Sequence, residues 1–445
     1  MSKAFWSGLV ITGLLLLEGM TLHSALGVQD KPKMLDKLPE LRLTLREAMQ
    51  AAINQSPTVQ IFLEQVKESQ AVAFTELGAM LPHLSGQATM GSRKFFLGNF
   101  GGTPRTSDIT DFYGTRAFLT QNLFSLSLIQ RWQASRVGIE VATLDLETSK
   151  RDTMATVALI YLEAISFEAA VKAREADVKL NKELLRLAQE RKSAGMATSL
   201  DVTRAKVQLE NEKQRLLVAR TNMERAKLNL LRAIGIPFGV TVVLTDELKR
   251  VEVPSQTLEE AMAVAMEERV ELKAQQRRER LAALSLSSVK SERIPSLAGS
   301  GDVGMVGNQI PDALTTHNVE LILSIPIFDG GQREGRISES RSRVLQESIR
   351  TRDLNLQIAL EVRDAILTLD SAQQEVLVTE EGLRQSLKEL DLARERFAVG
   401  VATNIEVTNA QASVAGARDN AIRALFNLNA ARVNMARAQG RLQDI

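Results

Sequence analysis

The chain has 445 residues, with 55 Lys and Arg against 54 Asp and Glu, three His and no Cys. A net charge of +1 gives no basic field for nucleic acid, and the lack of cysteine excludes thiolate metal sites, iron–sulfur clusters, disulfides and a thiol nucleophile. An aromatic content of 4%, beside abundant Ala, Leu, Glu, Arg and Gln, favours long helices and coiled coils.

The N-terminal segment has the pattern of a secretory signal peptide. Lys3 precedes an apolar run from Leu9 to Leu17, and small residues around Ala25 and Gly27 follow it. A run of about nine apolar residues is too short to span a bilayer as an anchor. We expect it to be the only segment apolar enough to enter a membrane as a helix. We therefore interpret residues 1–27 as a signal peptide and the chain as an exported protein.

The rest of the chain is an internal duplication. Residues Thr44–Met49 recur as Thr257–Met262 at an offset of 213, and Glu190–Ala205 recurs as Glu395–Ala410 at an offset of 205. The first copy therefore carries extra residues between these landmarks. The predicted organisation is a first repeat over 28–240, a connector over 241–256 and a second repeat over 257–445.

Each copy opens with an amphipathic helix and continues into two strands. In the first copy the helix has apolar residues at helical spacing from Leu45 to Ile53, and Pro82 marks a break after it, as Pro295 does in the second copy. The clearest strand runs from Val319 to Ile327 and alternates apolar with polar residues except at Ile322. The three further strands and the loop that we predict are Leu297–Val306, Ser85–Phe96 and Thr110–Leu123, with a Gly/Pro loop at Gly98–Thr106.

Very long helices follow the strands, because no proline occurs between Arg105 and Ile236 or after Ile327. A helix from about Leu128 to Ser193 would be roughly 100 Å long and would need neighbours along its whole length. In the second copy a heptad seam predicts coiled-coil packing. Its apolar members are Val362, Ile366, Leu369, Val376, Leu383, Leu387, Leu390 and Phe397.

Each copy then ends in a helical hairpin. Gly195 and Gly400 stand where a helix would stop with a left-handed residue. Thr198-x-x-Asp201 and Thr403-x-x-Glu406 follow them as capping boxes that start the next helix. The same arrangement in both copies predicts two tight antiparallel hairpins.

Together these elements predict a conduit. Four strands of about ten residues suit a tilted bilayer span, but an open sheet edge is not tolerated in hydrocarbon. Closure therefore requires several chains: three would give twelve strands and two would give eight. The long helices would extend from the membrane as a second tube around water.

Three motifs carry a resemblance to a known family. The segment Leu45–Pro57 resembles the opening helix of the TolC-type outer-membrane efflux family, and Leu81–Leu84 and Ile294–Leu297 resemble its entry into the barrel. The run Ile325–Gly331 is similar to its exit from the last strand into the long helix. The residues that we assign to these barrel–helix junctions are Pro82, Pro295, Pro326, Phe328, Gly330 and Gly331.

The resemblance implies a mostly α-helical homotrimer, with a twelve-stranded β-barrel in the outer membrane of a Gram-negative bacterium and an α-barrel in the periplasm. It implies outer-membrane lipid, a periplasmic adaptor (membrane fusion) protein and an inner-membrane pump or ABC exporter as partners, and no cofactor. The implied adaptor contacts at the hairpin ends are Gly195, Met196, Thr198, Gly400, Val401 and Thr403. The implied periplasmic constriction is Asp201, Glu406 and Asn409, where Asn409 replaces an acidic residue common in the family.

The chain departs from the family at two places. Gln121–Ser125 stands where the family often has Pro-Leu-Phe-Asp-Gly, and Val270 stands where the first copy has Pro57. Helix capping alone also accounts for the residues of the hairpin ends. We interpret the cluster Arg277–Arg280 as a solvated helix face.

Two other classes of function remain open at this point. An exported coiled-coil adaptor or scaffold would share the hairpins but would not need the strands. An enzyme on a helical scaffold is the third reading, although no Ser-His-Asp or paired-carboxylate arrangement stands out. The cargo of a conduit, whether drugs, metals or proteins, does not follow from the sequence.

Overall fold

The computed structural model describes residues 39–251 and 256–444, so the predicted signal peptide at 1–27 lies outside the described residues. The chain divides into a small unit, Met1–Glu40 with Gly239–Thr241, and a large unit, Leu41–Phe238 with Val242–Ile445. The large unit contains all the long helices and strands.

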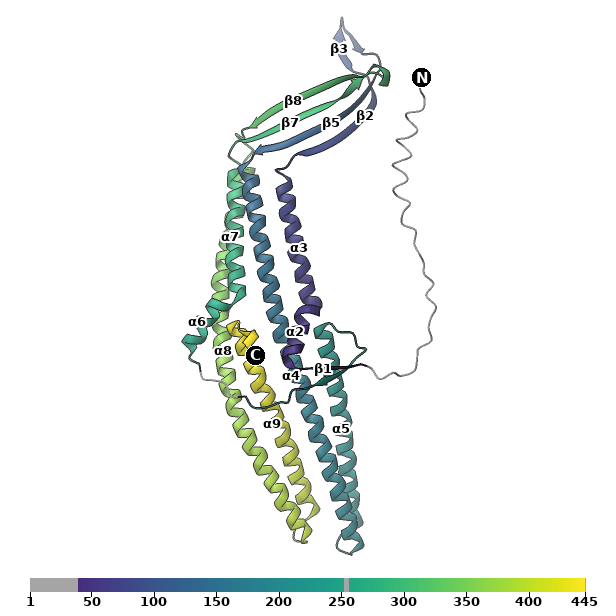
Figure 1. Ribbon diagram of the computed structural model, residues 1–445, viewed down its shortest axis with the longest axis vertical. Coiled ribbons are helices and arrows are strands. Elements are labelled where there is room, and N and C mark those ends of the chain that lie inside the picture. The colour runs from purple at the N-terminus through teal and green to yellow at the C-terminus, as the bar shows by residue number, and fades with distance from the viewer. Residues whose placement is uncertain (1–38, 252–255, 445) are drawn as a thin grey trace, which may run out of the picture. The chain divides into compact units, whose positions relative to one another are not determined.

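The two halves of the large unit repeat one order of elements: two helices, two long strands, a very long helix and a shorter one (Figure 1). The first half is α2 (Leu45–Gln55), α3 (Pro57–Gly78), β2 (His83–Arg93), β5 (Thr110–Phe124), α4 (Leu126–Ser193) and α5 (Ser199–Ile234). The second half is α6 (Leu258–Glu268), α7 (Val270–Ser291), β7 (Ser296–Gly307), β8 (Leu314–Ser324), α8 (Gln332–Ala398) and α9 (Asn404–Gln439). Shorter elements are β1 (Glu40–Leu43), β6 (Thr241–Leu244), η1 (Ile310–Asp312) and η2 (Leu442–Asp444).

The opening helix of each half is broken in two, and the two breaks have different causes. Pro57 is the first residue of α3, and Ser56 before it is extended, as the residue before a proline prefers. The second half has no proline there, yet Arg269 is also extended, at φ −70° and ψ 118°. The side chain of Arg269 is buried and pairs with Glu361 of α8 and with Glu271. An ion pair to a neighbouring helix thus accompanies the break where proline is missing.

The four long strands form one antiparallel sheet in the order β2-β5-β7-β8. The contact between β5 and β7, in which Ala117 lies opposite Val303, joins the two halves. Among the described residues, neither β2 nor β8 has a further neighbour on its outer side. Both edges of the sheet are therefore open.

The boundaries of β8 differ from the prediction. The strand begins at Leu314 and ends at Ser324, whereas the alternation predicted Val319–Ile327. Pro326 has no backbone N–H to donate to a strand ladder, which accounts for the earlier end. The prediction for β7, Leu297–Val306, is correct to within one residue at each end.

The loop predicted between β2 and β5 contains an additional hairpin. β2 ends at Arg93 instead of Phe96, and the strands β3 (Phe96–Phe100) and β4 (Thr103–Thr106) pair with each other. Gly101 and Gly102 between them both have positive φ, 61° and 82°, as a two-residue hairpin turn requires. Figure 1 places β3 beyond the ends of the four long strands.

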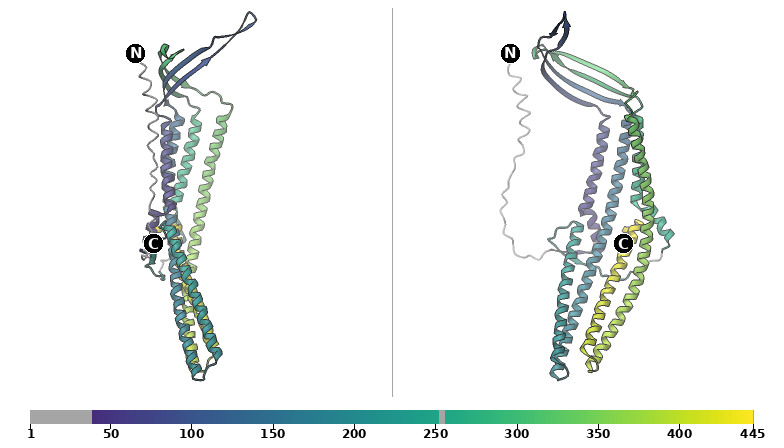
Figure 2. Two further views of the ribbon diagram at one scale, coloured as in Figure 1. Left: turned by 90° about the vertical axis from the view of Figure 1, so that its right-hand side faces the viewer. Right: turned by 180° about the vertical axis from the view of Figure 1, so that it is seen from behind.

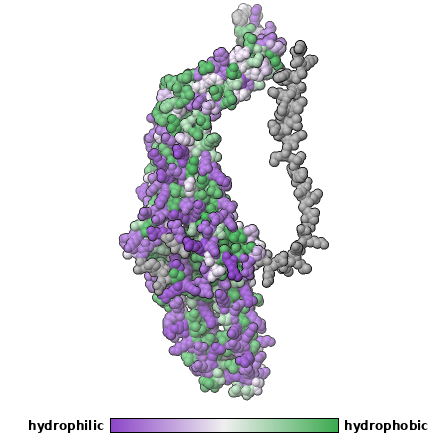
Figure 3. All heavy atoms as spheres, viewed as in Figure 1, coloured by the Kyte–Doolittle hydropathy of each residue, from purple (hydrophilic) through white to green (hydrophobic). Residues whose placement is uncertain are grey.

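The sheet has one apolar and one polar face. Val319, Leu321 and Leu323 of β8 share a face and are 83%, 70% and 61% exposed. The opposite face carries the ion pair between Arg116 and Asp302, and also Asn318 and Glu320. Figure 3 shows apolar residues exposed along the strands. A sheet with this division suits lipid on one side and water on the other.

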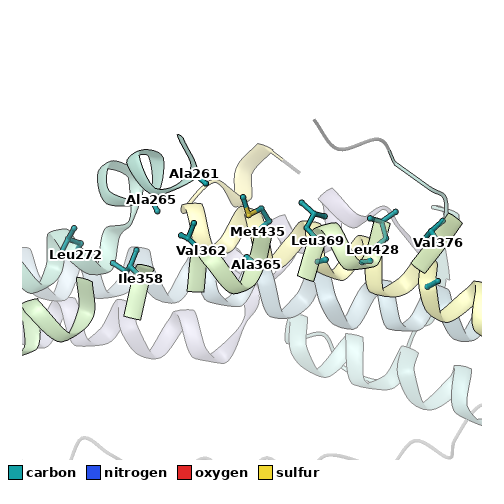
Figure 4. Close-up of a cluster of buried hydrophobic side chains, with 14 residues drawn as sticks. Ala261, Ala265, Leu272, Ile358, Val362, Ala365, Leu369, Val376, Leu428 and Met435 are labelled. Carbon is teal, nitrogen blue, oxygen red and sulfur yellow. The ribbon is translucent and has the colours of Figure 1, made fainter. Parts of the chain in front are cut away.

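The long helices α4 and α8, with 68 and 67 residues, are each about 100 Å long at 1.5 Å per residue. Near the sheet α4 packs against α3 and α7, and farther away it packs against α5 and α9. A core between α8 and α9 includes Val362, Leu369 and Val376 with Leu428 and Met435 (Figure 4).

The predicted heptad seam of α8 is largely buried. Five of its members are buried, whereas Leu387 is 37% exposed and lies outside the core. Ala365, Ala372 and Ala393 are also buried, which the heptad count did not include. The five buried members are Val362, Leu369, Val376, Leu390 and Phe397.

One expectation about membrane spans was wrong. Within the described residues, α4 is a helix long and apolar enough, by length and composition, to cross a membrane. Within α4, Ala155, Ala158 and Tyr161 are fully buried in the chain, and 44% of the most apolar window of the helix is buried. The hydroxyl of Tyr161 donates to the carbonyl of Leu43 at 2.8 Å and to Asp246 at 2.9 Å, and burial raises the pKa of Tyr161.

A comparison of the buried Arg269, which directly precedes α7, with the exposed Arg277 of α7 tests the packing. Replacing Arg269 by Ala should destabilise the protein by about 1.5–3 kcal/mol, because the half-buried carboxylates of Glu361 and Glu271 lose their charged hydrogen-bond donor. Replacing Arg277, which is exposed and pairs with Glu140, should cost only about 0–1 kcal/mol. Thermal unfolding of the detergent-solubilised variants measures both, and equal melting temperatures would contradict the assigned role of Arg269.

Candidate functional site

The two helical hairpins end on the side of the large unit opposite the sheet (Figure 2). Gly195 and Gly400 have φ values of 75° and 85°, as the predicted helix stops require. The amide of Met196 donates to the carbonyl of Arg191 at 2.8 Å, and the amide of Val401 donates to that of Arg396 at 3.0 Å. Both ends thus have the same closed turn.

The capping chemistry differs between the two ends. In the first hairpin the Thr198 amide donates to Asp201 at 2.9 Å, and the Asp201 amide donates to the Thr198 hydroxyl at 3.3 Å. The bond from the Thr198 backbone holds the pKa of Asp201 below its usual value. The predicted capping box of the second hairpin is wrong, since Thr403 makes no side-chain cap. The carboxylate of Glu406 pairs instead with Arg396 at 3.1 Å.

Large apolar side chains are exposed at both hairpin ends. Met196 is 65% exposed and Val401 is 67% exposed, and Leu200 and Ile405 are also exposed. A groove of about 300 Å³ lies between the first turns of α5 and α9. Its lining includes Thr203, Arg204, Val207, Gln208, Ile405, Thr408 and Asn409. The predicted constriction residue Asn409 is therefore part of a groove wall between the hairpins.

Charged side chains connect the two hairpins farther from their ends than this groove. Asp177 of α4 accepts from Arg418 of α9 at 2.5 Å and from Arg174 at 3.4 Å. Arg174 also pairs with Asp419 at 2.5 Å. Asp177 is only 6% exposed, and burial raises its pKa although both arginines act in the opposite direction.

A second contact joins the hairpins near their ends. The guanidinium of Arg191 lies 4.5 Å from the ring centroid of Phe397 and donates to the Phe397 carbonyl. Sequence reasoning did not find these links, because the partners are more than 200 residues apart and follow no local spacing rule.

The junction residues lie between strands and helices, as their positions in the sequence suggest. Pro82 stands between α3 and β2, and Pro295 directly precedes β7. Pro326 and the exposed Phe328 lie between β8 and α8, followed by Gly330 and Gly331 with positive φ.

The predicted solvated cluster on α7 lies beside α4. Arg277 pairs with Glu140 at 3.3 Å and Arg278 with Asp145 at 2.5 Å. Arg277 and Arg280 are exposed, in line with the predicted solvated helix face, although Arg277 and Arg278 also form ion pairs with α4. Over residues 39–251 and 256–444, no group of three or more His, Asp or Glu is placed to hold a metal ion.

The profile of the outer membrane efflux protein family matches residues 48–236 and 262–441, which is most of both halves. The chain belongs to the outer membrane efflux protein family. It is 24% identical over 413 residues to the pyoverdine export outer membrane protein OpmQ of Pseudomonas aeruginosa, covering 89% of this chain and 85% of OpmQ. It is 20% identical to TolC of Escherichia coli, covering 73% of this chain and 69% of TolC.

Solved structures share the fold. The outer membrane channel CmeC of Campylobacter jejuni matches with a TM-score of 0.76 at 14% identity, covering 89% of this chain and 86% of CmeC. VceC of Vibrio cholerae matches with a TM-score of 0.74 at 16% identity, covering 89% of this chain and 96% of VceC. The predicted resemblance and fold class are therefore confirmed.

Membership of this family gives the localisation and the general function of the protein. The protein is an efflux channel of the outer membrane of a Gram-negative bacterium and extends into the periplasm. Its relatives are named for export and efflux and not for a chemical reaction. The predicted localisation and general function are confirmed.

The unequal caps provide a second test. Replacing Thr198 by Ala should weaken the start of α5 by about 1 kcal/mol, because it removes the acceptor for the Asp201 amide. Replacing Thr403 by Ala removes no such bond and should have a smaller effect. Amide hydrogen exchange in the first turns of α5 and α9 measures the difference, and equal acceleration in both would contradict it.

Proposed function

We propose that three copies of the chain close into a passive conduit with no catalytic step, which carries cargo from the periplasm through the outer membrane. The open sheet is the observation on which the proposal rests. Unpaired backbone groups at β2 and β8 cost several kcal/mol each in hydrocarbon, so other copies must pair with them. Three copies give a closed barrel of twelve strands.

The two free edges are suited to each other. β2 and β8 both have 11 residues, so they can pair along their whole length. The duplication supplies the geometry, because β8 stands in the second half where β5 stands in the first. Pairing of β8 with β2 of the next copy would repeat the β5–β7 contact within the chain.

Exposed apolar side chains on the helices support the same assembly. A row on α8 has alternating spacings of four and seven residues, an eleven-residue repeat that keeps these exposed side chains on one face of the helix. On α3, Ile61 and Phe74 are 59% and 69% exposed. A second copy is the occupant that covers both. The row consists of Leu345, Ile349, Leu356, Leu360 and Leu367.

We further propose that the hairpin ends bind a periplasmic adaptor that delivers cargo from an inner-membrane pump or ABC exporter. The exposed Met196 and Val401 and the groove beside them support this role. The contact residues are Gly195, Met196, Thr198, Gly400, Val401 and Thr403.

The narrowest part of the conduit is assigned to Asp201, Glu406 and Asn409. Because Arg396 pairs with Glu406 and Asn409 is neutral, this constriction carries less negative charge than a ring of free carboxylates would.

The proposed protomer of the assembly consists of a first repeat over 28–240, a connector over 241–256 and a second repeat over 257–445. The coiled-coil scaffold is disfavoured, because a scaffold has no need for an apolar-faced sheet.

Lysine substitutions on the two faces of β8 test the membrane assignment. Leu321→Lys puts a charge on the apolar face and should cost about 2–4 kcal/mol, which would lower the yield of outer-membrane trimers. Ile322→Lys, the adjacent residue on the polar face, is the control and should be tolerated. Fractionation followed by unheated SDS gels measures both yields. Release of the unmodified protein with the soluble periplasm would contradict the proposal.

Photo-crosslinking separates the two proposed interfaces. A photoreactive residue in place of Met196 should form adducts with the adaptor, because this side chain is exposed at a hairpin end. The same group in place of Leu356 should join copies of the chain to each other. Mass spectrometry identifies the adducts. Self-adducts from the hairpin end, or none from Leu356, would count against the respective interface.

A further inference from the structure

The β3–β4 hairpin and the segments that flank it expose large apolar side chains at the end of the sheet that lies away from the helices. Phe95, Phe96, Leu97 and Ile109 are each more than half exposed. Hydrogen bonds hold the base of the hairpin together, because the Phe95 amide donates to the Ser107 hydroxyl at 2.8 Å and the Ser107 amide donates to the Phe95 carbonyl at 2.7 Å. An ordered surface with this many exposed apolar side chains is typical of an interaction site.

Cations lie next to these apolar side chains. Lys94 directly precedes Phe95, and Arg105 of β4 lies opposite Gly98 in the register of the hairpin. Within the described part of the chain, neither Lys94 nor Arg105 takes part in an ion pair. The segment 93–111 has three cationic and two acidic side chains, and both acidic ones follow β4. The hairpin can therefore offer two charged donors to an anionic group without breaking an ion pair of its own.

The hairpin lies on the outer side of the membrane. It joins the ends of β2 and β5 that are farthest from α3 and α4, and the helices extend into the periplasm (Figure 1). The outer leaflet of a Gram-negative outer membrane consists of phosphorylated glycolipid, which presents phosphates and sugar rings just beyond its acyl chains. Aromatic side chains favour this interfacial depth, and Lys and Arg bind lipid phosphates there.

The hairpin of a neighbouring copy is a less suitable occupant of this surface. In the second repeat the turn that contains η1 stands in place of the hairpin, and its residues 307–314 include no Lys or Arg. In the proposed ring this turn would separate the hairpin of one copy from the hairpin of the next. Lipid would therefore border each hairpin.

We propose that the β3–β4 hairpin binds the phosphorylated glycolipid of the outer leaflet. Lys94 and Arg105 donate to the phosphates of the lipid, and Phe95, Phe96 and Ile109 contact its sugar rings and the upper part of its acyl chains. The inference rests on the proposed barrel, which sets the depth of the hairpin in the membrane.

Binding of diphosphoryl lipid A to the purified trimer tests the inference. Native mass spectrometry of the protein in detergent measures the apparent dissociation constant. Lys94→Gln with Arg105→Gln should weaken binding about 25-fold, because each cation contributes about fivefold to the affinity for an anionic lipid. The control, Lys67→Gln with Arg186→Gln, removes the same charges from exposed sites on α3 and α4 and should leave the constant unchanged.

A second pair of variants tests the apolar contact. Phe96→Ser should weaken binding of lipid A about tenfold, because burial of a phenylalanine side chain is worth at least this much. Ile310→Ser changes an exposed apolar residue at the same end of the sheet in the second repeat and should have no effect. Inorganic phosphate should displace no more lipid A than chloride does at equal ionic strength. An unchanged constant in the Lys94 and Arg105 double variant, or specific displacement by phosphate, would overturn the inference.

A photoreactive residue in place of Phe96 identifies the occupant in intact cells. We expect an adduct with the glycolipid, whereas an adduct with a second copy of the chain, or none, would count against the proposal. The failure of this inference is distinct from the failure of the conduit. An unmodified protein that forms no trimers on unheated gels contradicts the conduit, and normal trimers whose hairpin variants still bind lipid A contradict only the glycolipid site.

Discussion

The constraint on which this structure depends is that backbone N–H and C=O groups cannot remain unpaired in hydrocarbon. The chain contributes a sheet that is apolar on one face and open at both edges, so it is incomplete as a single copy. The long helices α4 and α8 follow β5 and β8 in the chain, and α8 carries an exposed apolar row that the proposed assembly would cover. In the proposed assembly, neighbouring copies would pair with both edges of the sheet.

Much of the fold could be predicted because its signals are local and occur twice. The alternation of Val319, Leu321 and Leu323, the heptad spacing of Val362 and Leu369, and the glycines at 195 and 400 each reflect a short-range rule. The parts that escaped prediction depend on contacts distant in sequence. Nothing near Arg269 indicates that Glu361, 92 residues away, holds the helix break.

The candidate site shows the same division. Turn geometry at the hairpin ends follows from Gly195 and Gly400, and it was predicted correctly. The second capping box was predicted from spacing alone and is absent, and the carboxylate of Glu406 pairs with Arg396 instead. The links from Asp177 to Arg418 and from Arg191 to Phe397 could not be predicted from local spacing, because the two partners of each link are more than 200 residues apart in the sequence.

The β3–β4 hairpin has a consequence for the outer surface of the cell. It occurs in the first repeat, and the second repeat has only the short turn around Ile310–Asp312 at the equivalent place. In a ring of three chains the six repeats would give the walls approximate sixfold symmetry. The rim would have only threefold symmetry, because one hairpin would project from each chain. In the proposed trimer, an antibody or a bacteriophage that approaches from outside would therefore meet three projecting hairpins and not an even rim.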